Sequence, residues 1–138
     1  MTRSLTAPKV HVSVREPADV AMARKHARDL AAQEGLPEVA TEALATAVSE
    51  IAQNIVDHAG AGDILIAALR EKGRRGLLVI ARDDGPGIAD LAQAQKDGYS
   101  TSGTLGIGLS SARRFMDEFE LVSAPGVGTT VTMKKWAP

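Results

Sequence analysis

Apolar residues recur along the first half of the chain with two different periods, which predict one strand followed by two helices. Between residues 9 and 16, valine fills alternate positions among polar residues, as in a half-buried strand. From Pro17 onward, and again from about residue 39 to residue 58, apolar residues recur every three or four positions, as on the buried face of a helix. Gly35 is suited to cap the first helix, and the glycines of 60–62 end the second.

Shorter stretches in the second half predict two hairpins. The aliphatic stretches 63–71 and 76–84 read as strands joined by the polar turn KGRRG. The closing stretches 121–124 and 129–136 predict a second hairpin around the turn PGVG. Between the hairpins we expect two more helices, around residues 89–96 and from about residue 107 to residue 119.

The order β-α-α-β-β-α-α-β-β contains three hairpin-like connections. It favours an α+β fold, a two-layer sandwich in which a mixed, mostly antiparallel sheet carries its helices on one face. The length of 138 residues suits one core, and no linker divides the chain, so we expect a single domain over residues 1–138.

Composition narrows the function classes. A formal net charge of −1 without long runs of one sign is not typical of proteins that bind nucleic acid or membrane surfaces. Aromatic residues make up 3%, which predicts an aliphatic core, and the lack of cysteine excludes disulfides, thiolate catalysis and zinc-thiolate sites. The N-terminus has no apolar signal region and no apolar run reaches membrane length, so we expect a cytoplasmic protein.

A carboxylate and a carboxamide share one face of the second predicted helix. Glu50 and Asn54 are four residues apart, so their side chains are neighbours. Such a pair could hold a hydrated Mg²⁺ ion through the amide oxygen and use the acid as a base. Taken alone, an exposed polar face explains the pair better, because Glu and Asn are common on helix surfaces.

A second candidate lies where the strand 76–84 ends. Asp83 follows an apolar run, where a carboxylate is costly to bury unless it meets a hydrogen-bond donor such as the amine of adenine. Gly85 and Gly87 would let a ligand approach the backbone, although a simple strand-ending turn explains them too. Asp84 should point the other way, toward solvent.

Residues 100–109, with the sequence STSGTLGIGL, form a glycine-rich loop before a predicted helix. The free N–H groups and positive dipole end of a helix N-terminus suit phosphate, and no G-K-[ST] follows, so the loop is not a Walker A motif. Thr129, in the turn-strand stretch PGVGTTV, could reach a ligand or be an ordinary strand residue.

The order and spacing of these four segments resemble the N, G1, G2 and G-T boxes of the GHKL (Bergerat-fold) ATP-binding superfamily, over roughly residues 9–136. The segments SEIAQNIV, ARDDGPGI and DGYSTSGTLGIGL resemble those of the stressosome switch kinases (RsbT-like). These are small serine/threonine-protein kinases, with anti-sigma-factor kinases as near relatives.

The resemblance implies roles for these residues. Asp83 would bind adenine, aided by Gly87 and Thr129, and Gly85 would also contact the nucleotide. Asn54 would ligate Mg²⁺, and Glu50 would be the catalytic base for transfer of the ATP γ-phosphate. The loop would close over the triphosphate, with Gly103 as a hinge. Its nucleotide-binding residues would be Ser100, Thr101, Ser102, Gly103, Thr104, Leu105, Gly106, Gly108 and Leu109.

The resemblance also implies partners: an STAS-domain protein as substrate and a PP2C-type phosphatase that the freed kinase activates. An anti-sigma factor with kinase activity and a non-catalytic nucleotide-binding module are the alternatives, and a homodimer stays open. No lysine or arginine is assigned to the γ-phosphate, because Lys96 and Arg113 read as solvated helix residues and Arg74 and Arg75 as surface.

Overall fold

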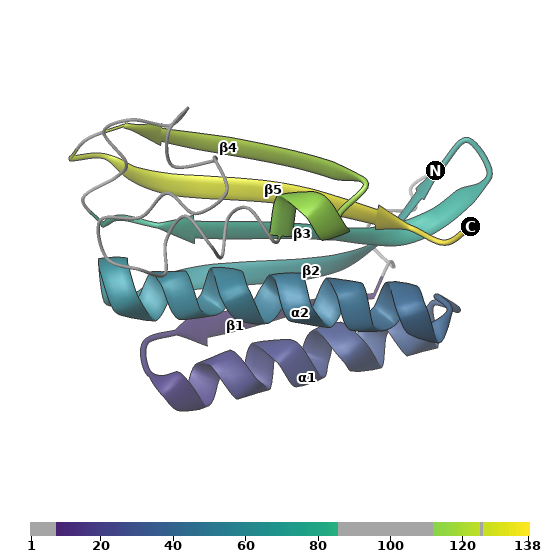
Figure 1. The fold of residues 1–138 in the computed structure, drawn as a ribbon, viewed down its shortest axis with the longest axis horizontal. Coiled ribbons are helices and arrows are strands. Elements are labelled where there is room, and N and C mark those ends of the chain that lie inside the picture. The colour runs from purple at the N-terminus through teal and green to yellow at the C-terminus, as the bar shows by residue number, and fades with distance from the viewer. Residues whose placement is uncertain (1–7, 86–111, 125) are drawn as a thin grey trace.

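The structure is a computed structural model that describes residues 8–85, 112–124 and 126–138. Helices cover one face of a five-stranded sheet with strand order β1-β2-β3-β5-β4 (Figure 1). The strands are β1 (Lys9–Val14), β2 (Gly62–Glu71), β3 (Arg74–Asp83), β4 (Glu118–Ala124) and β5 (Gly128–Trp136). The helices are α1 (Pro17–Gln33), α2 (Glu38–Asn54) and a π-helical turn, η2 (Ile55–Ala59).

The expected α+β sandwich is confirmed. Every described strand pair is antiparallel, so the parallel pairing that a mixed sheet would include does not occur among the described residues. The second predicted helix reaches the expected length, but its last five residues form the π-turn η2. The expected helix at residues 89–96 and the start of the helix at residue 107 lie outside the described residues.

Caps explain where α1 begins and ends. The backbone N–H groups of Arg15 and Glu16 donate to Asp19 Oδ2 at 2.8 and 3.2 Å, so they belong to the cap at the start of α1, and β1 ends at Val14 and not at the expected residue 16. Gly35, at φ +84°, is the predicted C-terminal cap, where a residue with a side chain would be strained.

Other expected boundaries are wrong too. The β2–β3 turn is only Lys72 and Gly73, both at positive φ, so Arg74 and Arg75 belong to β3, which begins two residues before the predicted strand. The helix expected to residue 119 ends at residue 115, and β4 begins at Glu118 in place of the expected residue 121. Asp117 explains this end, because its N–H donates to Lys134 O at 3.0 Å and its Oδ2 accepts from Trp136 N at 2.7 Å.

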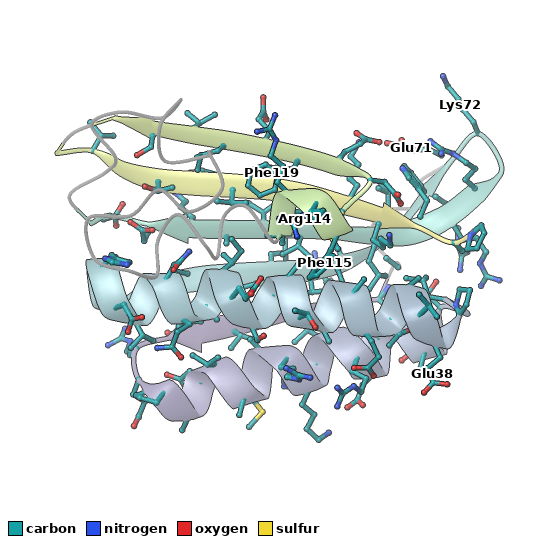
Figure 2. The ribbon with its side chains drawn as sticks, in the orientation of Figure 1. Glu38, Glu71, Lys72, Arg114, Phe115 and Phe119 are labelled. Atoms are coloured by element: carbon teal, nitrogen blue, oxygen red, sulfur yellow. The ribbon has the colours of Figure 1, made fainter. Side chains whose placement is uncertain are left out.

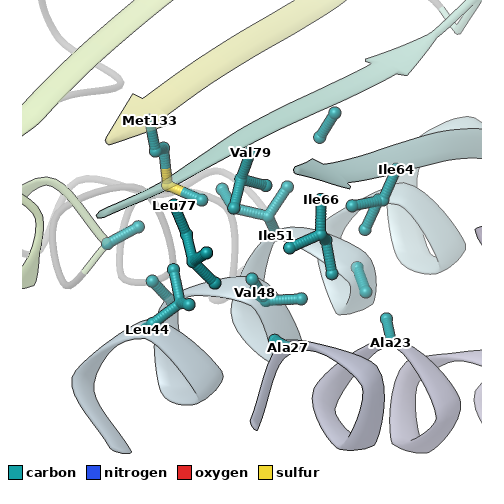
Figure 3. Packing of buried hydrophobic residues seen from close by; sticks show 14 of the residues in the cluster. Ala23, Ala27, Leu44, Val48, Ile51, Ile64, Ile66, Leu77, Val79 and Met133 are labelled. Carbon is teal, nitrogen blue, oxygen red and sulfur yellow. The ribbon is translucent and has the colours of Figure 1, made fainter. Parts of the chain in front are cut away.

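The core between the sheet and the helices is aliphatic, as the composition predicts. Leu44, Val48 and Ile51 of α2 pack against strand residues that share the helix-facing side of the sheet (Figure 3). These strand residues are Ile64, Ile66, Leu77, Val79 and Met133. The small side chains of Ala23 and Ala27 bring α1 close to the same core, and Phe115 and Phe119 pack at its margin (Figure 2). Among the described residues, no helix is both long and apolar enough to cross a bilayer.

Trp136 fixes the C-terminal end of β5. Its ring lies so close to Gly76 that a Cβ atom there would be 2.8 Å from Trp136 Cε3. The guanidinium of Arg74 stacks on the ring at 4.1 Å from its centroid, and the indole N–H donates to Glu118 Oε2 at 3.1 Å. The tryptophan is therefore buried and held on three sides at the end of the sheet opposite to Asp83.

Candidate functional site

Asp83 is the last residue of β3 and lies on the side of the sheet that faces the helices. Leu77, Val79 and Ala81, at alternate positions before it, are buried under the helices, and Asp83 itself is half-buried. Its Oδ1 accepts a hydrogen bond from the Gly85 N–H at 2.9 Å. This bond fixes the carboxylate and leaves Oδ2 as its second acceptor. Asp84 is exposed, as predicted.

Glycines surround Asp83 because side chains would collide there. A Cβ atom on Gly62, its partner in β2, would lie 2.7 Å from Arg82 O and 3.1 Å from Asp83 Cβ. A Cβ atom on Gly128, at φ +118°, would overlap the carbonyl oxygen of Asp83. The backbone of three segments therefore converges on this carboxylate.

Thr129 lies opposite Asp83 in the β3–β5 register, and Ser123 lies opposite Thr129 in the β4–β5 register. The hydroxyls of Ser123 and Thr129 are hydrogen-bonded at 2.9 Å, and Ser123 Oγ also donates to Gly128 O at 2.9 Å. The structure therefore brings Thr129 beside Asp83 and adds Ser123, which the sequence did not single out. The β4–β5 register was the signal that could have identified it.

Glu50 and Asn54 lie one turn apart on α2, beside the buried stripe that contains Ala47 and Ile51. Both side chains are half-buried. Glu50 Oε1 and Asn54 Nδ2 are fully covered, and neither has a hydrogen-bond partner among the described residues. A buried polar atom without a partner costs roughly 1–3 kcal/mol, which is unusual in a folded protein and marks a place where a ligand, ion or water is expected. The exposed-face explanation of the pair is therefore wrong.

Burial raises the pKa of the Glu50 carboxyl above its ordinary value, because the charged form loses hydration there. A carboxylate with a raised pKa takes up a proton more readily than an exposed glutamate does. This is the property that a general base near neutral pH needs.

The turn η2 connects the Asn54 end of α2 to the Asp83 end of the sheet. It begins one residue after Asn54, and its last residue, Ala59, contacts Gly85, since a Cβ atom on Gly85 would lie 2.7 Å from Ala59 Cβ. The helical segment that carries Glu50 and Asn54 therefore ends, through η2, beside Gly85, the residue that donates a hydrogen bond to the Asp83 carboxylate.

The other predicted residues lie outside the described part of the chain. These are Gly87, Ser100, Thr101, Ser102, Gly103, Thr104, Leu105, Gly106, Gly108 and Leu109, together with Lys96. Arg74, Arg75 and Arg113 are exposed, which agrees with their assignment to the surface.

Comparison with known proteins places the chain in a family. Residues 14–135 match the model of the histidine kinase-like ATPase domain. The serine/threonine-protein kinase RsbT of Bacillus subtilis is 44% identical over 118 residues, which cover 86% of this chain and 89% of that protein. The anti-sigma F factor of Halalkalibacterium halodurans is 37% identical over 97 residues, which cover 65% of each chain.

Solved structures show the same fold. The crystal structure of the RsbU and RsbW domains of Rv1364c from Mycobacterium tuberculosis superposes with a TM-score of 0.64 at 21% identity, over 95% of this chain and 33% of that chain. A histidine kinase domain from Erythrobacter litoralis EL346 superposes with a TM-score of 0.55 at 17% identity, over 86% of this chain and 59% of that one. With these matches beside the α+β architecture, the chain belongs to the histidine kinase-like ATPase domain family and, within it, to the ATP-using serine/threonine-protein kinases of the RsbT type.

Proposed function

We propose that the protein transfers the γ-phosphate of ATP to a serine or threonine of an STAS-domain antagonist in a bacterial partner-switching pathway. When released from that antagonist, the kinase would bind and activate a PP2C-type phosphatase. The 44% identity to the serine/threonine-protein kinase RsbT, over 89% of that protein's length, supports this proposal.

The observation that carries the proposal is the pair of buried, unpartnered atoms Glu50 Oε1 and Asn54 Nδ2. A chain that only needed a stable helix would gain by replacing both with residues that leave no polar atom unsatisfied. A carboxylate and a carboxamide one turn apart fit the needs of phosphoryl transfer, which depends on positioning and on charge neutralisation.

Asn54 would hold Mg²⁺ through its amide oxygen, which is the kind of ligand that Mg²⁺ takes alongside water and phosphate oxygens. The covered Nδ2 is a hydrogen-bond donor and would not ligate the ion; it would donate to a phosphate oxygen or to water. The ion, when bound, would neutralise charge on the phosphate oxygens. Glu50 would accept the proton of the attacking hydroxyl, and its buried Oε1 has no hydrogen-bond partner among the described residues that would compete for that proton.

Asp83 would recognise adenine through Oδ2, which can accept a hydrogen bond from the exocyclic amine. The Gly85 N–H holds Oδ1, so the orientation of Oδ2 is set before the nucleotide arrives. Gly85, Gly87 and Thr129 would complete the adenine site. The loop 100–109 would cover the triphosphate.

The test is a transfer assay with γ-labelled ATP, Mg²⁺ and candidate STAS-domain proteins recovered by pull-down, followed by mapping of the phosphorylated residue. We expect label on one serine or threonine of the STAS protein, and transfer slower by about 10²–10⁴-fold with the Glu50→Gln variant. Nucleotide binding without transfer to any recovered STAS partner would favour the alternative, a nucleotide-binding regulatory module without catalysis.

An anti-sigma factor with kinase activity is the second candidate, favoured by the 37% identity to the anti-sigma F factor. Its partner distinguishes it. Stable co-purification with a sigma factor would replace the switch-kinase proposal, whereas recovery of a phosphatase and an STAS protein without a sigma factor would support it.

A further inference from the structure

The turn η2 departs from α-helical geometry directly after Asn54. The Gly60 N–H donates to Ile55 O at 2.8 Å, a spacing of five residues where an α-helix has four. The extra residue widens the turn, and the chain then leaves it at Gly60 with a φ of +85°. π-turns are rare in proteins and often occur at functional sites, so a π-turn beside the candidate site suggests a role in that site.

Both ends of η2 contact a glycine. At its first residue, Ile55 Cγ2 would be 2.9 Å from a Cβ atom on Gly62. At its last residue, Ala59 Cβ and Cα would be 2.7 and 2.9 Å from a Cβ atom on Gly85. At such distances a Cβ atom would collide with η2, so neither glycine can carry a side chain without displacing the turn.

These two glycines flank Asp83. Gly62 pairs with Asp83 across the β2–β3 register, and Gly85 donates the hydrogen bond that holds Asp83 Oδ1 at 2.9 Å. The π-turn therefore lies against Gly62, the β2 residue paired with Asp83, and against Gly85, two residues after Asp83 in the sequence. The Asp83 carboxylate accepts a hydrogen bond from Gly85, and Gly85 lies beside Ala59.

We propose that η2 is a positioning element for the Asp83 carboxylate and that Ala59 is its positioning residue, acting through Gly85 to set how selectively the site takes adenine. This inference rests on the proposed role of Asp83 in binding the exocyclic amine. Ala59 itself touches no nucleotide. Its side chain is small enough to let Gly85 approach and large enough to stop the turn from shifting inward.

The substitution Ala59→Val tests the proposal, because the added methyl groups push Gly85 away and weaken its bond to Asp83 Oδ1. The dissociation constants of ATP and of inosine triphosphate are measured by calorimetry in Mg²⁺ buffer. Inosine triphosphate carries a carbonyl where ATP carries the amine, so it does not use the Asp83 contact. The exposed Ala61, substituted by valine, is the matched control.

We expect the unsubstituted protein to prefer ATP by about tenfold or more. Ala59→Val should raise the dissociation constant of ATP by about tenfold and change that of inosine triphosphate less than about twofold, since displacement of one positioned group removes only the contact it makes. Ala61→Val should keep the preference. Equal weakening of both nucleotides in Ala59→Val would show a merely structural role and overturn the inference.

Ala59→Gly gives a second measurement that does not depend on tolerating a larger side chain. It removes the contact with Gly85, so the preference for ATP should fall here too, by about threefold. An unchanged preference in Ala59→Gly overturns the inference whether or not Ala59→Val folds. If the unsubstituted protein itself fails to distinguish the two nucleotides, the adenine role of Asp83 is wrong, which is a separate failure of the proposed function.

Discussion

Thr129 on β5 lies directly opposite Asp83 on β3, in the last pair of the antiparallel register between these strands. The next pair inward joins residues on the other face, and the pair after that joins Ala81 with Val131, both buried in the core. The helix-facing side of the sheet thus changes from apolar to polar within two residues. A ligand bound beside this pair would contact the carboxylate of Asp83 and the hydroxyl of Thr129, next to the packed hydrophobic core.

Replacing Asp83 by asparagine tests the adenine assignment. The amide keeps an oxygen for the Gly85 N–H, but it loses the charge and can present an NH₂ group to the nucleotide amine. We expect the dissociation constant of ATP to rise roughly 10- to 100-fold, the equivalent of 1.5–3 kcal/mol for a hydrogen bond to a charged group. Calorimetry measures the constant, and undiminished affinity would remove Asp83 from the adenine site.

Asn54→Ala tests the metal assignment. Because the variant lacks the amide oxygen, half-maximal phosphate transfer should need about tenfold more Mg²⁺. Gln53→Ala is the control, since Gln53 makes a hydrogen bond to Asp57 Oδ1 at 3.0 Å and is not assigned to the site. The same Mg²⁺ requirement in both variants would show that Asn54 does not hold the ion.

Glu50→Gln tests the base. The amide is nearly the same size and cannot accept the proton, so transfer should slow by about 10²–10⁴-fold while ATP binding stays within about twofold. In the unsubstituted protein, burial raises the Glu50 pKa, so the rate should begin to fall with decreasing pH earlier than for an exposed glutamate. A single-turnover pH profile measures this, and turnover in Glu50→Gln equal to that of the parent would end the candidacy of Glu50.

The raised pKa of Glu50 also makes the free energy of unfolding depend on pH. Because the folded-state pKa of Glu50 is raised, the protonated carboxyl is the form that favours folding, and this contribution is lost as the pH rises through the folded pKa. Glu50→Gln should therefore be more stable than the parent at neutral pH, and the difference should shrink as the pH falls from the folded-state pKa to the lower pKa of the unfolded chain. Urea unfolding at several pH values checks the trend. A parent that gains on the variant with rising pH would contradict it.

Gly128→Ala tests the close approach of β5 to Asp83. The new Cβ atom would overlap the Asp83 carbonyl and sit at φ +118°, so we expect the free energy of unfolding to fall by about 2 kcal/mol or more. Gly126→Ala is the matched control, because Gly126 also has positive φ, at +77°, but open space around it. That control should lose about 1 kcal/mol from backbone strain alone. Equal losses would mean that the contact with Asp83 is unimportant.

Much of this arrangement can be predicted from the sequence. The strands around Val12, Ile64 and Val79 follow from alternation, and the pairing of Glu50 with Asn54 follows from a spacing of four residues on a helix. The π-turn could not be predicted, because one five-residue stretch has too few apolar positions to distinguish five-residue from four-residue spacing.

The end of the last helix was mispredicted for a related reason. The stretch RRFMDEFEL fits a helical period as well as a strand period, and only the bonds of Asp117 to β5 decide between them. Ser123 lay inside the predicted strand 121–124, but its place beside Thr129 depends on the register of the hairpin, which the sequence analysis did not work out.

The position of Trp136 has a practical consequence. It is the one tryptophan of the sequence, and it pairs with Gly76 at the end of β5 opposite to Thr129. It lies seven positions along β5 from Thr129, which at 3.3 Å per residue is about 23 Å. Its fluorescence, shaped by the stacked Arg74, will therefore report unfolding of the sheet without direct quenching by a nucleotide at Asp83. The protein carries its own optical probe for separating loss of fold from loss of ligand in each of the variants above.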